Sequence, residues 1–328
     1  MNPTFTPKTA LTACMKDEGI FVLEWLAYHL GMGFDRVIVV TNDCTDGSPA
    51  LLDRLAEMGL VTHIQQEVPE GRPPQDAGMD HVLRLCRDEG ITHLLHIDSD
   101  EFLFFPEWTL GKLLKRNHKA DVVAIPWINF GDGGVRDWVP GDLVTERNTM
   151  SEPDTNPGVT KFKSLFKVAS FARATDHNPL EPLIDAPKVT RPDGRKLRNG
   201  TLFQPKSARY RPLGMACNVK DAFIFHYAVR SEDLFLMKNH RGDGQGKNGA
   251  DDTKYHLGSH WHEQANRNDV ENPLMQPHVP GIKAKLAELR SDPKVAQAER
   301  ACQEWFSAKR AAVLTPERRA AWSREQAV

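Results

Sequence analysis

The stretch Leu94-Leu95-His96-Ile97-Asp98-Ser99-Asp100-Glu101 decides how this chain is interpreted. A mainly apolar run that ends in acids is typical of a buried strand that delivers carboxylates to the edge of a sheet. Side chains two positions apart on extended backbone point to the same side, so we expect Asp98 and Asp100 to face one space. Paired carboxylates suit a hard divalent cation such as Mg²⁺ or Mn²⁺, and such a cation can hold a diphosphate.

The sequence before this stretch alternates between strands and helices. The predicted strands are Ala10–Cys14, Val37–Val40, Leu60–Ile64 and Ile91–Ile97, and the predicted helices are Gly19–Leu30, Ser48–Gly59 and about Asp76–Asp88. This order predicts an α/β fold with a doubly wound, mainly parallel, Rossmann-like sheet. Ligands of such sheets bind beyond the carboxyl ends of the strands. We therefore expect the polar groups at 16–18, 42–46 and 98–101 to converge.

The later sequence is less regular. We expect a helix at Thr109–Asn117, a strand at Val122–Phe130 broken by Pro126, an irregular section at Gly131–Gly158, short strands at Ser164–Val168, Thr201–Gln204 and Ala222–Ala228, and a helix from Ser231. The predicted division is a catalytic domain at 1–241, with a nucleotide-binding half at about 8–105 and an acceptor-side half at about 106–241. A mobile loop region rich in glycine and histidine follows at 242–280. A helical tail at 281–328 is interrupted at Pro293 and Pro316.

The composition excludes several classes of protein. The formal net charge of the 328 residues is −2, which argues against a general nucleic-acid binder. No apolar run is long enough for a transmembrane helix, and the N-terminus lacks the pattern of a signal peptide. The five cysteines are scattered without metal-motif spacing, as in a reduced cytoplasmic protein. We expect a cytoplasmic location, and peripheral contact with a membrane stays open.

Several motifs, in order along the chain, carry a resemblance to known enzymes. The first half resembles family 2 glycosyltransferases, which have the glycosyltransferase A fold, and the later part is similar to the family 92 type. The matching pieces are Lys16-Asp17-Glu18, Asn42–Ser48, Asp98-Ser99-Asp100 with Glu101-Phe102, Trp127–Gly131, Lys163-Ser164, His177-Asn178-Pro179, and Phe225-His226-Tyr227 running on to Arg230-Ser231 and Lys238. D-x-D alone is a weak signal, and the ordered set is stronger.

The resemblance implies transfer of one sugar from a nucleotide-diphosphate sugar, a UDP-sugar above all, to a hydroxyl of a glycan or lipid-linked acceptor. By carry-over, Asp98, Asp100 and His226 would hold Mn²⁺ or Mg²⁺, which stabilises the charge of the leaving diphosphate. The donor would be contacted by Lys16, Asp17, Glu18, Asn42 and Asp43, and its phosphates would be neutralised by Lys163, Lys238 and Arg241, with Lys161 as a weaker candidate. His226 is equally well explained as a core histidine beside two aromatic residues.

A base near the acceptor hydroxyl is needed if the transfer inverts configuration. Asp132 and Asp137 follow the strand that ends at Phe130, and Asp132 is the preferred candidate. The stereochemical course, the sugar and the acceptor stay open. Trp127 and Trp138 are expected in the core rather than against a sugar ring.

Two features depart from the resemblance or stand outside it. Asn42-Asp43-Cys44-Thr45 replaces the usual Asp-Asp-Gly-Ser run, and the Gln-x-x-Arg-Trp signature of processive synthases is missing from the sequence. His256, His260 and His262 have a spacing that can bind zinc on a helix. A polar surface loop is the favoured interpretation, and a lid over the substrate is another.

Two other functional classes remain open. The D-x-D motif also occurs in nucleotidyltransferases and phosphatases, although a phosphatase of the haloacid dehalogenase type would carry it after the first strand. A catalytically inactive relative that binds a glycan or a protein partner is the alternative that is not an enzyme. The complete D-x-D and the other acidic strand ends weigh against that alternative.

Overall fold

The computed structural model describes residues 7–107, 109–154, 160–197, 202–205, 220–242 and 254–323. Its strands are β1 (Thr9–Met15), β2 (Arg36–Thr41), β3 (Thr62–Gln65), β4 (His93–His96), β5 (Glu101–Phe104), β6 (Val122–Asn129), β7 (Met150–Ser151), β8 (Phe162–Lys167), β9 (Phe171–Ala174), β10 (Pro179–Pro182), β11 (Val189–Thr190), β12 (Phe223–His226) and β13 (Val270–Glu271). Its helices are α1 (Gly19–His29), α2 (Ser48–Glu57), α3 (Pro74–Asp88), α4 (Leu110–Arg116), α5 (Val144–Arg147), α6 (Glu232–Arg241), α7 (His260–Ala265), α8 (Val279–Arg290), α9 (Pro293–Val313) and α10 (Pro316–Trp322), with 3₁₀ turns η1 (Val168–Ser170) and η3 (Gln276–His278).

One large sheet runs through the molecule. Its strands lie in the order β3-β2-β1-β4-β8-β6-β12-β5, and β11 also pairs with β6. The four strands from β3 to β4 are parallel, as are the pairs β6–β12 and β6–β11. β8 and β5 enter antiparallel to their neighbours. The predicted α/β class with a doubly wound, mainly parallel sheet is confirmed.

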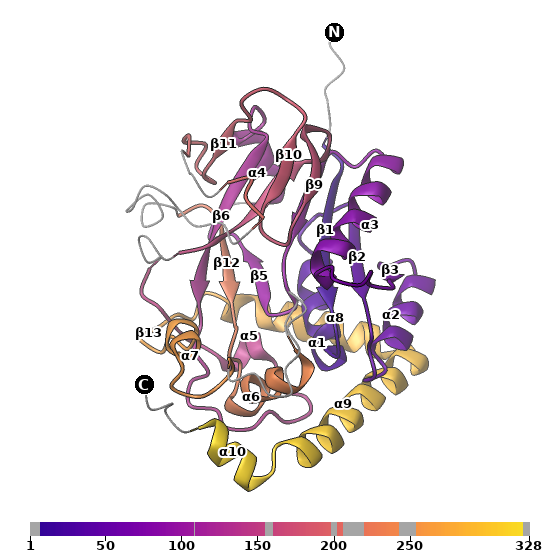
Figure 1. The fold of residues 1–328 in the computed structure, drawn as a ribbon, viewed down its shortest axis with the longest axis vertical. Coiled ribbons are helices and arrows are strands. Elements are labelled where there is room, and N and C mark those ends of the chain that lie inside the picture. Colours follow the sequence, from indigo (N-terminus) through magenta and orange to yellow (C-terminus); the bar gives the residue numbers. More distant parts are fainter. Residues whose placement is uncertain are drawn as a thin grey trace.

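Helices from both ends of the chain cover the sheet. In α1, ten of the eleven residues are buried, so this helix packs on all sides rather than through one stripe. It contacts α2, α8 and α9, and α9 also lies against α2 (Figure 1). The predicted breaks at Pro293 and Pro316 are confirmed, since each proline opens a helix of the tail. The C-terminal helices thus brace the nucleotide-binding half predicted from the sequence.

Pro126 does not break its strand, contrary to the prediction. β6 is continuous, and Pro126 lies opposite Phe162 of β8. The Trp127 N–H donates to the Lys161 carbonyl on that side, at 3.0 Å. Because successive backbone N–H groups point to opposite sides, the proline nitrogen faces the other edge of β6. That edge pairs with β11 only up to Val123 and with β12 only from Trp127, so no ladder bond is lost.

Three other local predictions change. The predicted strand at Thr201–Gln204 is wrong where it is described, because residues 202–205 form turns. The irregular section after Phe130 contains the short elements α5 and β7. The region 242–280 is not a plain loop, because its residues 254–280 include α7, β13 and η3, while most of its glycine-rich start lies outside the described residues. The division of 1–241 into two halves stays a prediction.

The histidines of that region do not form a polar surface loop. His260 and His262 lie on α7, and the His262 ring packs against Phe235 with 5.0 Å between centroids. The His256 side chain is buried, and both of its ring nitrogens lack hydrogen-bond partners among the described residues. Burial lowers the pKa of His256 and of His262, which favours neutral rings. We attribute structural roles to both histidines.

Candidate functional site

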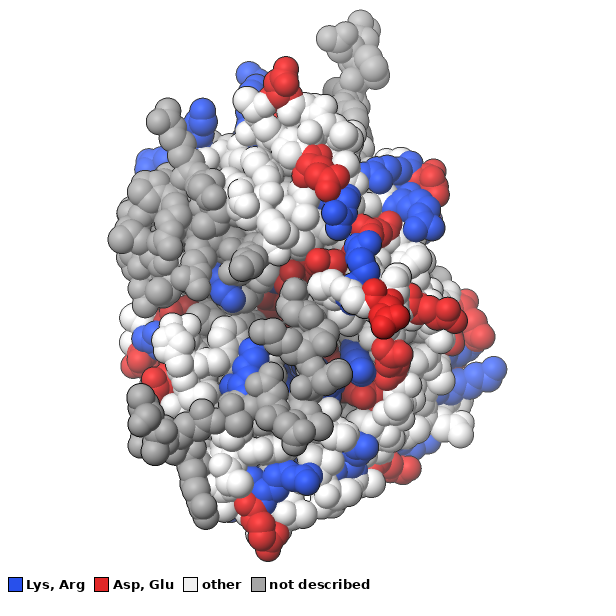
Figure 2. All heavy atoms as spheres, viewed as in Figure 1, with Lys and Arg blue, Asp and Glu red and all other residues white. Residues whose placement is uncertain are grey.

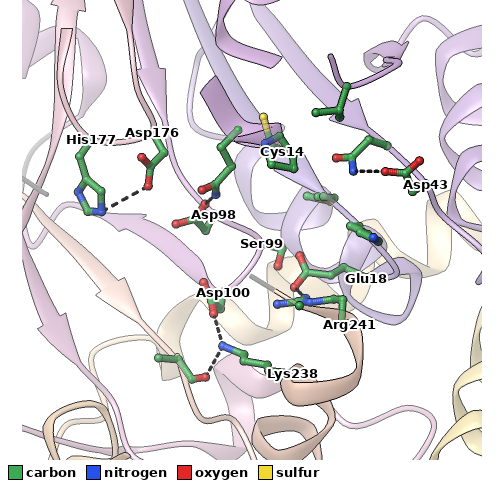
Figure 3. A pocket seen from close by; sticks show the side chains of 18 of the residues that line it. Cys14, Glu18, Asp43, Asp98, Ser99, Asp100, Asp176, His177, Lys238 and Arg241 are labelled. Atoms are coloured by element: carbon green, nitrogen blue, oxygen red, sulfur yellow. Dashed lines mark hydrogen bonds and ion pairs between the residues drawn. The ribbon is translucent and has the colours of Figure 1, made fainter. Parts of the chain in front are cut away.

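The carboxyl ends of β1, β2 and β4 open into one pocket of about 430 Å³. Nine of the predicted site residues line it: Lys16, Glu18, Asn42, Asp43, Asp98, Asp100, His226, Lys238 and Arg241 (Figure 3). The predicted convergence of the three polar strand ends is therefore confirmed. The second half of the chain closes the pocket with β12 and α6, which contribute His226 and the two cations that follow it.

The D-x-D segment is a turn between β4 and β5, not extended backbone. The Glu101 N–H donates to the Asp98 carbonyl at 3.0 Å, and the Asp98 N–H donates to the Glu101 carboxylate at 2.8 Å. Arg230 is buried and stabilises the turn, since its Nη2 donates to Ser99 Oγ at 3.1 Å. Because the backbone turns here, Asp98 and Asp100 line the same pocket but contact different partners.

Asp98 forms an ion pair with a buried lysine of β8. Lys163 Nζ lies 2.8 Å from Asp98 Oδ2, and Gln75 Nε2 donates to Asp98 Oδ1, also at 2.8 Å. The same ammonium lies 3.4 Å from Glu101 Oε2 and 4.0 Å from Asp176 Oδ2. Burial alone would lower the pKa of Lys163, but these carboxylates together raise it, so the ammonium stays charged. Lys163 does not line the pocket, and the structure therefore does not place it for direct contact with a phosphate.

Asp100 belongs to a different group. Lys238 Nζ lies 3.0 Å from Asp100 Oδ2, and His226 Nε2 lies 3.8 Å from Asp100 Oδ1. Burial opposes ionisation of Asp100, but Lys238, His226 and Arg230 hold its pKa well below the usual range. Asp100 is therefore an ionised carboxylate with one oxygen turned toward the imidazole.

His226 presents a free nitrogen to Asp100. Its Nδ1 lies 3.0 Å from Asn129 Oδ1, and since an amide oxygen only accepts, Nδ1 carries the proton. Burial lowers the pKa of His226 to about 4, with Asp100 opposing and Lys238 adding to that shift. The ring is therefore neutral at pH 7, with the Nε2 lone pair directed to the pocket side. This is the state in which histidine binds metals.

The remaining predicted donor contacts lie at the rim. Arg241 forms an ion pair with Glu18, and Asn42 Nδ2 donates to Asp43 Oδ2 at 2.9 Å (Figure 3). Asp43 has a positive φ of 47°, which turns the chain sharply after β2. Lys16 lines the same pocket. The ion pair of Glu18 with Arg241 links the segment after β1 to α6 across the opening.

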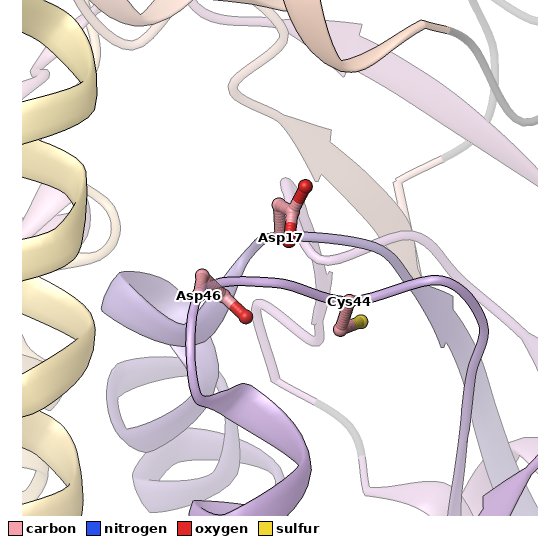
Figure 4. Close-up of side chains that lie close together, drawn as sticks. All are labelled: Asp17, Cys44 and Asp46. Carbon is pink, nitrogen blue, oxygen red and sulfur yellow. The ribbon is translucent and has the colours of Figure 1, made fainter.

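Asp17 does not reach the pocket lining. In the described part of the chain, the one group of acids, histidines or cysteines with ligand atoms all within 4.8 Å is Asp17, Cys44 and Asp46 (Figure 4). Asp17 Oδ1 accepts from the Thr45 N–H at 2.6 Å, and Asp46 accepts from the N–H groups of Gly19 and Ser48. Burial raises the pKa of the Cys44 thiol, so it stays protonated. These acids fasten the loop between β2 and α2, and we assign no metal to them.

Asp132 also lies outside the pocket lining. Its carboxylate accepts from Asn266 Nδ2 at 3.1 Å and from the Gly134 N–H at 2.9 Å. The Asp132 N–H in turn donates to Asn266 Oδ1 at 2.8 Å. Asp132 thus ties the end of β6 to the segment after α7. The structure does not bring it to the other predicted site residues, so its assignment as the base gains no support.

Several pocket residues were not predicted. They include Cys14, Gln75, Ser99, Asp176, His177, Lys254, Tyr255 and Trp261, together with part of the segment 68–74. His177 lies within the matched motif His177-Asn178-Pro179, so the resemblance carried a signal for it. Its Nε2 lies 3.5 Å from Asp176 Oδ2 (Figure 3). Gln75 sits at the start of α3, where no sequence pattern marks it.

The surface around the site carries both signs of charge. On the face drawn in Figure 2, acidic and basic side chains are intermixed over the described residues. None of the described helices is long and apolar enough to cross a membrane.

Comparison with known proteins agrees with the resemblance. A glycosyltransferase family 92 protein of Ricinus communis is 27% identical over 129 residues, which is 38% of this chain. The match spans only 21% of that relative's length. No protein-family model matches the chain.

Solved structures of S. aureus TarS are also similar in part. The 1–349 fragment has 12% identity and a TM-score of 0.36, with 92% of each chain covered. The same fragment in complex with UDP-GlcNAc has 13% identity and a TM-score of 0.31, and the match covers 49% of this chain and 46% of that one. Likenesses this weak carry no argument about function. The sequence match confirms the predicted resemblance: over 129 residues, this chain is similar to a family 92 glycosyltransferase.

Proposed function

We propose that this protein is a metal-dependent glycosyltransferase. It would move one sugar from a nucleotide-diphosphate sugar, in particular a UDP-sugar, to a hydroxyl of a glycan or lipid-linked acceptor. The observation that carries the proposal is the pair formed by Asp100 and a neutral His226 at the edge of the pocket, 3.8 Å apart. The similarity to a family 92 glycosyltransferase supports the same reaction class.

The donor set fits Mn²⁺ or Mg²⁺ held together with a diphosphate. A carboxylate oxygen and an imidazole nitrogen face each other, and both are ligands that Mn²⁺ accepts. Mg²⁺ sites commonly use one or two carboxylates and complete the shell with substrate phosphates and water. Asp98 is the less suited of the two acids, because Gln75 and Lys163 already occupy its two oxygens. We therefore propose Asp100 and His226 as the primary ligands, with Asp98 as support.

The chain's own residues would bind and orient the donor. When bound, the cation supplies a Lewis acid that stabilises charge on the leaving diphosphate. Lys238 and Arg241 line the same pocket and add positive charge beside the phosphates. Asn42 and Asp43 lie at the end of β2, where the nucleoside would rest. Lys163 would act indirectly, by holding the Asp98 turn in place.

Isothermal calorimetry of UDP with and without MnCl₂ tests this proposal. We expect binding that depends on the metal and falls at least tenfold in Asp100→Asn and in His226→Gln. Asp88→Asn is the matched control, because Asp88 is an exposed carboxylate at the end of α3. Metal-independent binding, or variants that bind like the parent, would refute the metal site.

Product analysis then identifies the reaction. Incubation with UDP-glucose, UDP-galactose and UDP-N-acetylglucosamine should release UDP in the presence of an acceptor. Release of pyrophosphate from a nucleoside triphosphate would instead indicate nucleotidyl transfer. Metal-dependent UDP binding without turnover of any donor would favour the inactive relative.

A further inference from the structure

A second pocket adjoins the first, behind Trp127. It has a volume of about 140 Å³, and it shares Trp127, Lys161 and Trp261 with the larger pocket. Six residues line only the second pocket, and five of them are polar or charged: Asn129, Glu152, Thr160, Gln264 and Arg267, with Ala265 as the apolar one. Of these residues, only Asn129 contacts the proposed donor site, through its hydrogen bond to His226 Nδ1.

The walls of the second pocket are aromatic. Lys161 Nζ lies 5.2 Å from the ring centroids of both Trp127 and Trp261, so the cation bridges the two indoles. Neither indole N–H has a hydrogen-bond partner among the described residues. Apolar ring faces beside carboxylate, amide and guanidinium groups suit a saccharide, whose C–H faces pack on rings while its hydroxyls form hydrogen bonds.

Glu152 is the carboxylate of this pocket and is 4% exposed. Its Oε1 accepts from the Asn129 N–H at 2.7 Å and from Asn129 Nδ2 at 3.0 Å. Its Oε2 accepts no hydrogen bond from any residue within the described ranges. One oxygen therefore fixes the side chain, and the other is available to a ligand.

Glu152 also lies close to the donor site. Asn129 Oδ1 is 3.0 Å from His226 Nδ1, and His226 Nε2 is 3.8 Å from Asp100 Oδ1. One side chain, Asn129, thus connects Glu152 to His226, which is one of the two proposed primary metal ligands. The two pockets meet at Trp127, which lines both of them and whose ring lies 4.1 Å from that of His226.

We propose that the second pocket binds the acceptor saccharide and that Glu152 is the catalytic base. This inference rests on the proposed function and deepens it. The acceptor O–H proton passes to Glu152 Oε2 as the acceptor oxygen bonds to the anomeric carbon of the donor. The bond from that carbon to the diphosphate oxygen breaks, and its electron pair leaves with the nucleoside diphosphate. A single displacement of this kind inverts the anomeric configuration.

The environment of Glu152 agrees with the task of a base. Burial raises its pKa to about 7, against the opposing effects of Asn129 and Arg267, while Asp269 raises it further. Lys161 is the other charged group that lines the pocket. A base whose pKa lies near the working pH combines ionisation with proton affinity.

Glu152→Gln separates catalysis from positioning. The glutamine oxygen can still accept both Asn129 hydrogen bonds, but the side chain cannot take a proton. We expect metal-dependent UDP binding within twofold of the parent and a transfer kcat lower by ~10²-fold or more. The rise of kcat with pH through about 7 should vanish in the variant. Retained kcat with the parent pH profile would overturn the role of Glu152. Glu146→Gln is the matched control, since Glu146 pairs with Lys283 on the surface.

Gln264→Trp tests the saccharide site itself, because Gln264 lines only the second pocket. The probes are methyl β-D-glucopyranoside, methyl β-D-galactopyranoside and methyl N-acetyl-β-D-glucosaminide, observed by saturation-transfer difference NMR. We expect a signal from at least one glycoside with the parent, lost in the variant, with UDP binding unchanged. Silence from all three, or a signal that survives the substitution, overturns the proposal. Failure of the proposed function differs, because the parent itself would then not bind UDP with Mn²⁺.

Discussion

The two halves predicted from the sequence contribute opposite charges to the ion pairs at the pocket. The first half, at about 8–105, supplies the carboxylates, and the half at about 106–241 supplies the cations from β8 and α6. Three ion pairs join them: Asp98 with Lys163, Asp100 with Lys238, and Glu18 with Arg241. The first half alone would hold repelling acids, and the second would hold uncompensated buried cations. The ion pairs at the site therefore stabilise the contact between the two halves, in addition to lining or supporting the pocket.

This difference bears on how the pocket would receive the proposed donor. A diphosphate and a divalent cation carry charges of opposite sign, so the net charge around the ion pairs changes little when both bind together. A diphosphate alone would meet Asp98 and Asp100, and a cation alone would meet Lys238 and Arg241. We therefore expect nucleotide and metal to bind with positive coupling.

Removal of Lys163 should have the largest effect on stability. Lys163→Met would leave Asp98, Glu101 and Asp176 without their shared cation, and one of these carboxylates, Glu101, is fully buried. Loss of one partner from a buried ion group costs about 3–5 kcal/mol. Urea denaturation followed by circular dichroism measures the change in the free energy of unfolding.

Lys167→Met is the matched control for Lys163→Met. Lys167 lies on the same strand, and its partly exposed ammonium is 3.5 Å from Asp121. We expect a loss below about 1 kcal/mol there. Equal losses of unfolding free energy in the two variants would mean that the Asp98–Lys163 pair stabilises the protein no more than a surface ion pair does. The ion pairs between the halves would then not explain how the halves are held together.

Glu24 tests a contact between the two halves that is made by hydrogen bonds rather than by an ion pair. Its carboxylate, on α1, accepts from the N–H groups of Val144 and Thr145 and from Thr145 Oγ1 at 2.7–3.1 Å. Glu24→Gln would set amide hydrogens against a backbone donor, which should cost about 1–3 kcal/mol in thermal or urea denaturation. Glu57→Gln on the exposed side of α2 should stay below about 1 kcal/mol. An unchanged free energy of unfolding in Glu24→Gln would show that α5 packs through its apolar contacts alone.

The same two halves differ in how well the sequence predicts them. Apolar runs that end in acids predicted β1, β2 and β4 and the convergence of Lys16, Asn42 and Asp98, because parallel strands end on one edge. The partner of each acid was beyond reach, since Asp98–Lys163 and Asp100–Lys238 are 65 and 138 positions apart. Only the tertiary fold fixes such pairs.

Irregular segments account for the rest of what the sequence did not predict. Glu152 follows the two-residue strand β7, and Asp176 lies in the turn between β9 and β10. Neither stretch has a periodicity that separates a site residue from a solvated one. Asp132 shows the converse, because its place after β6 suggested a base, whereas its hydrogen bonds to Asn266 and Gly134 give it a structural role.

Glu152 should have a smaller effect on stability, and that effect depends on pH. This acid lies in the second half, and its hydrogen bonds come from Asn129 of the same half. Its pKa is about 7 when folded, against 4.5 ordinarily. Between these values the folded chain keeps a proton that the unfolded chain loses, so this contribution is complete below pH 4.5 and is lost as the pH rises through 7. The free energy of unfolding of the parent should therefore fall relative to Glu152→Gln by up to ~1.4 kcal/mol per pH unit across that window. Parallel stability curves for parent and variant would mean that folding does not raise the pKa of Glu152.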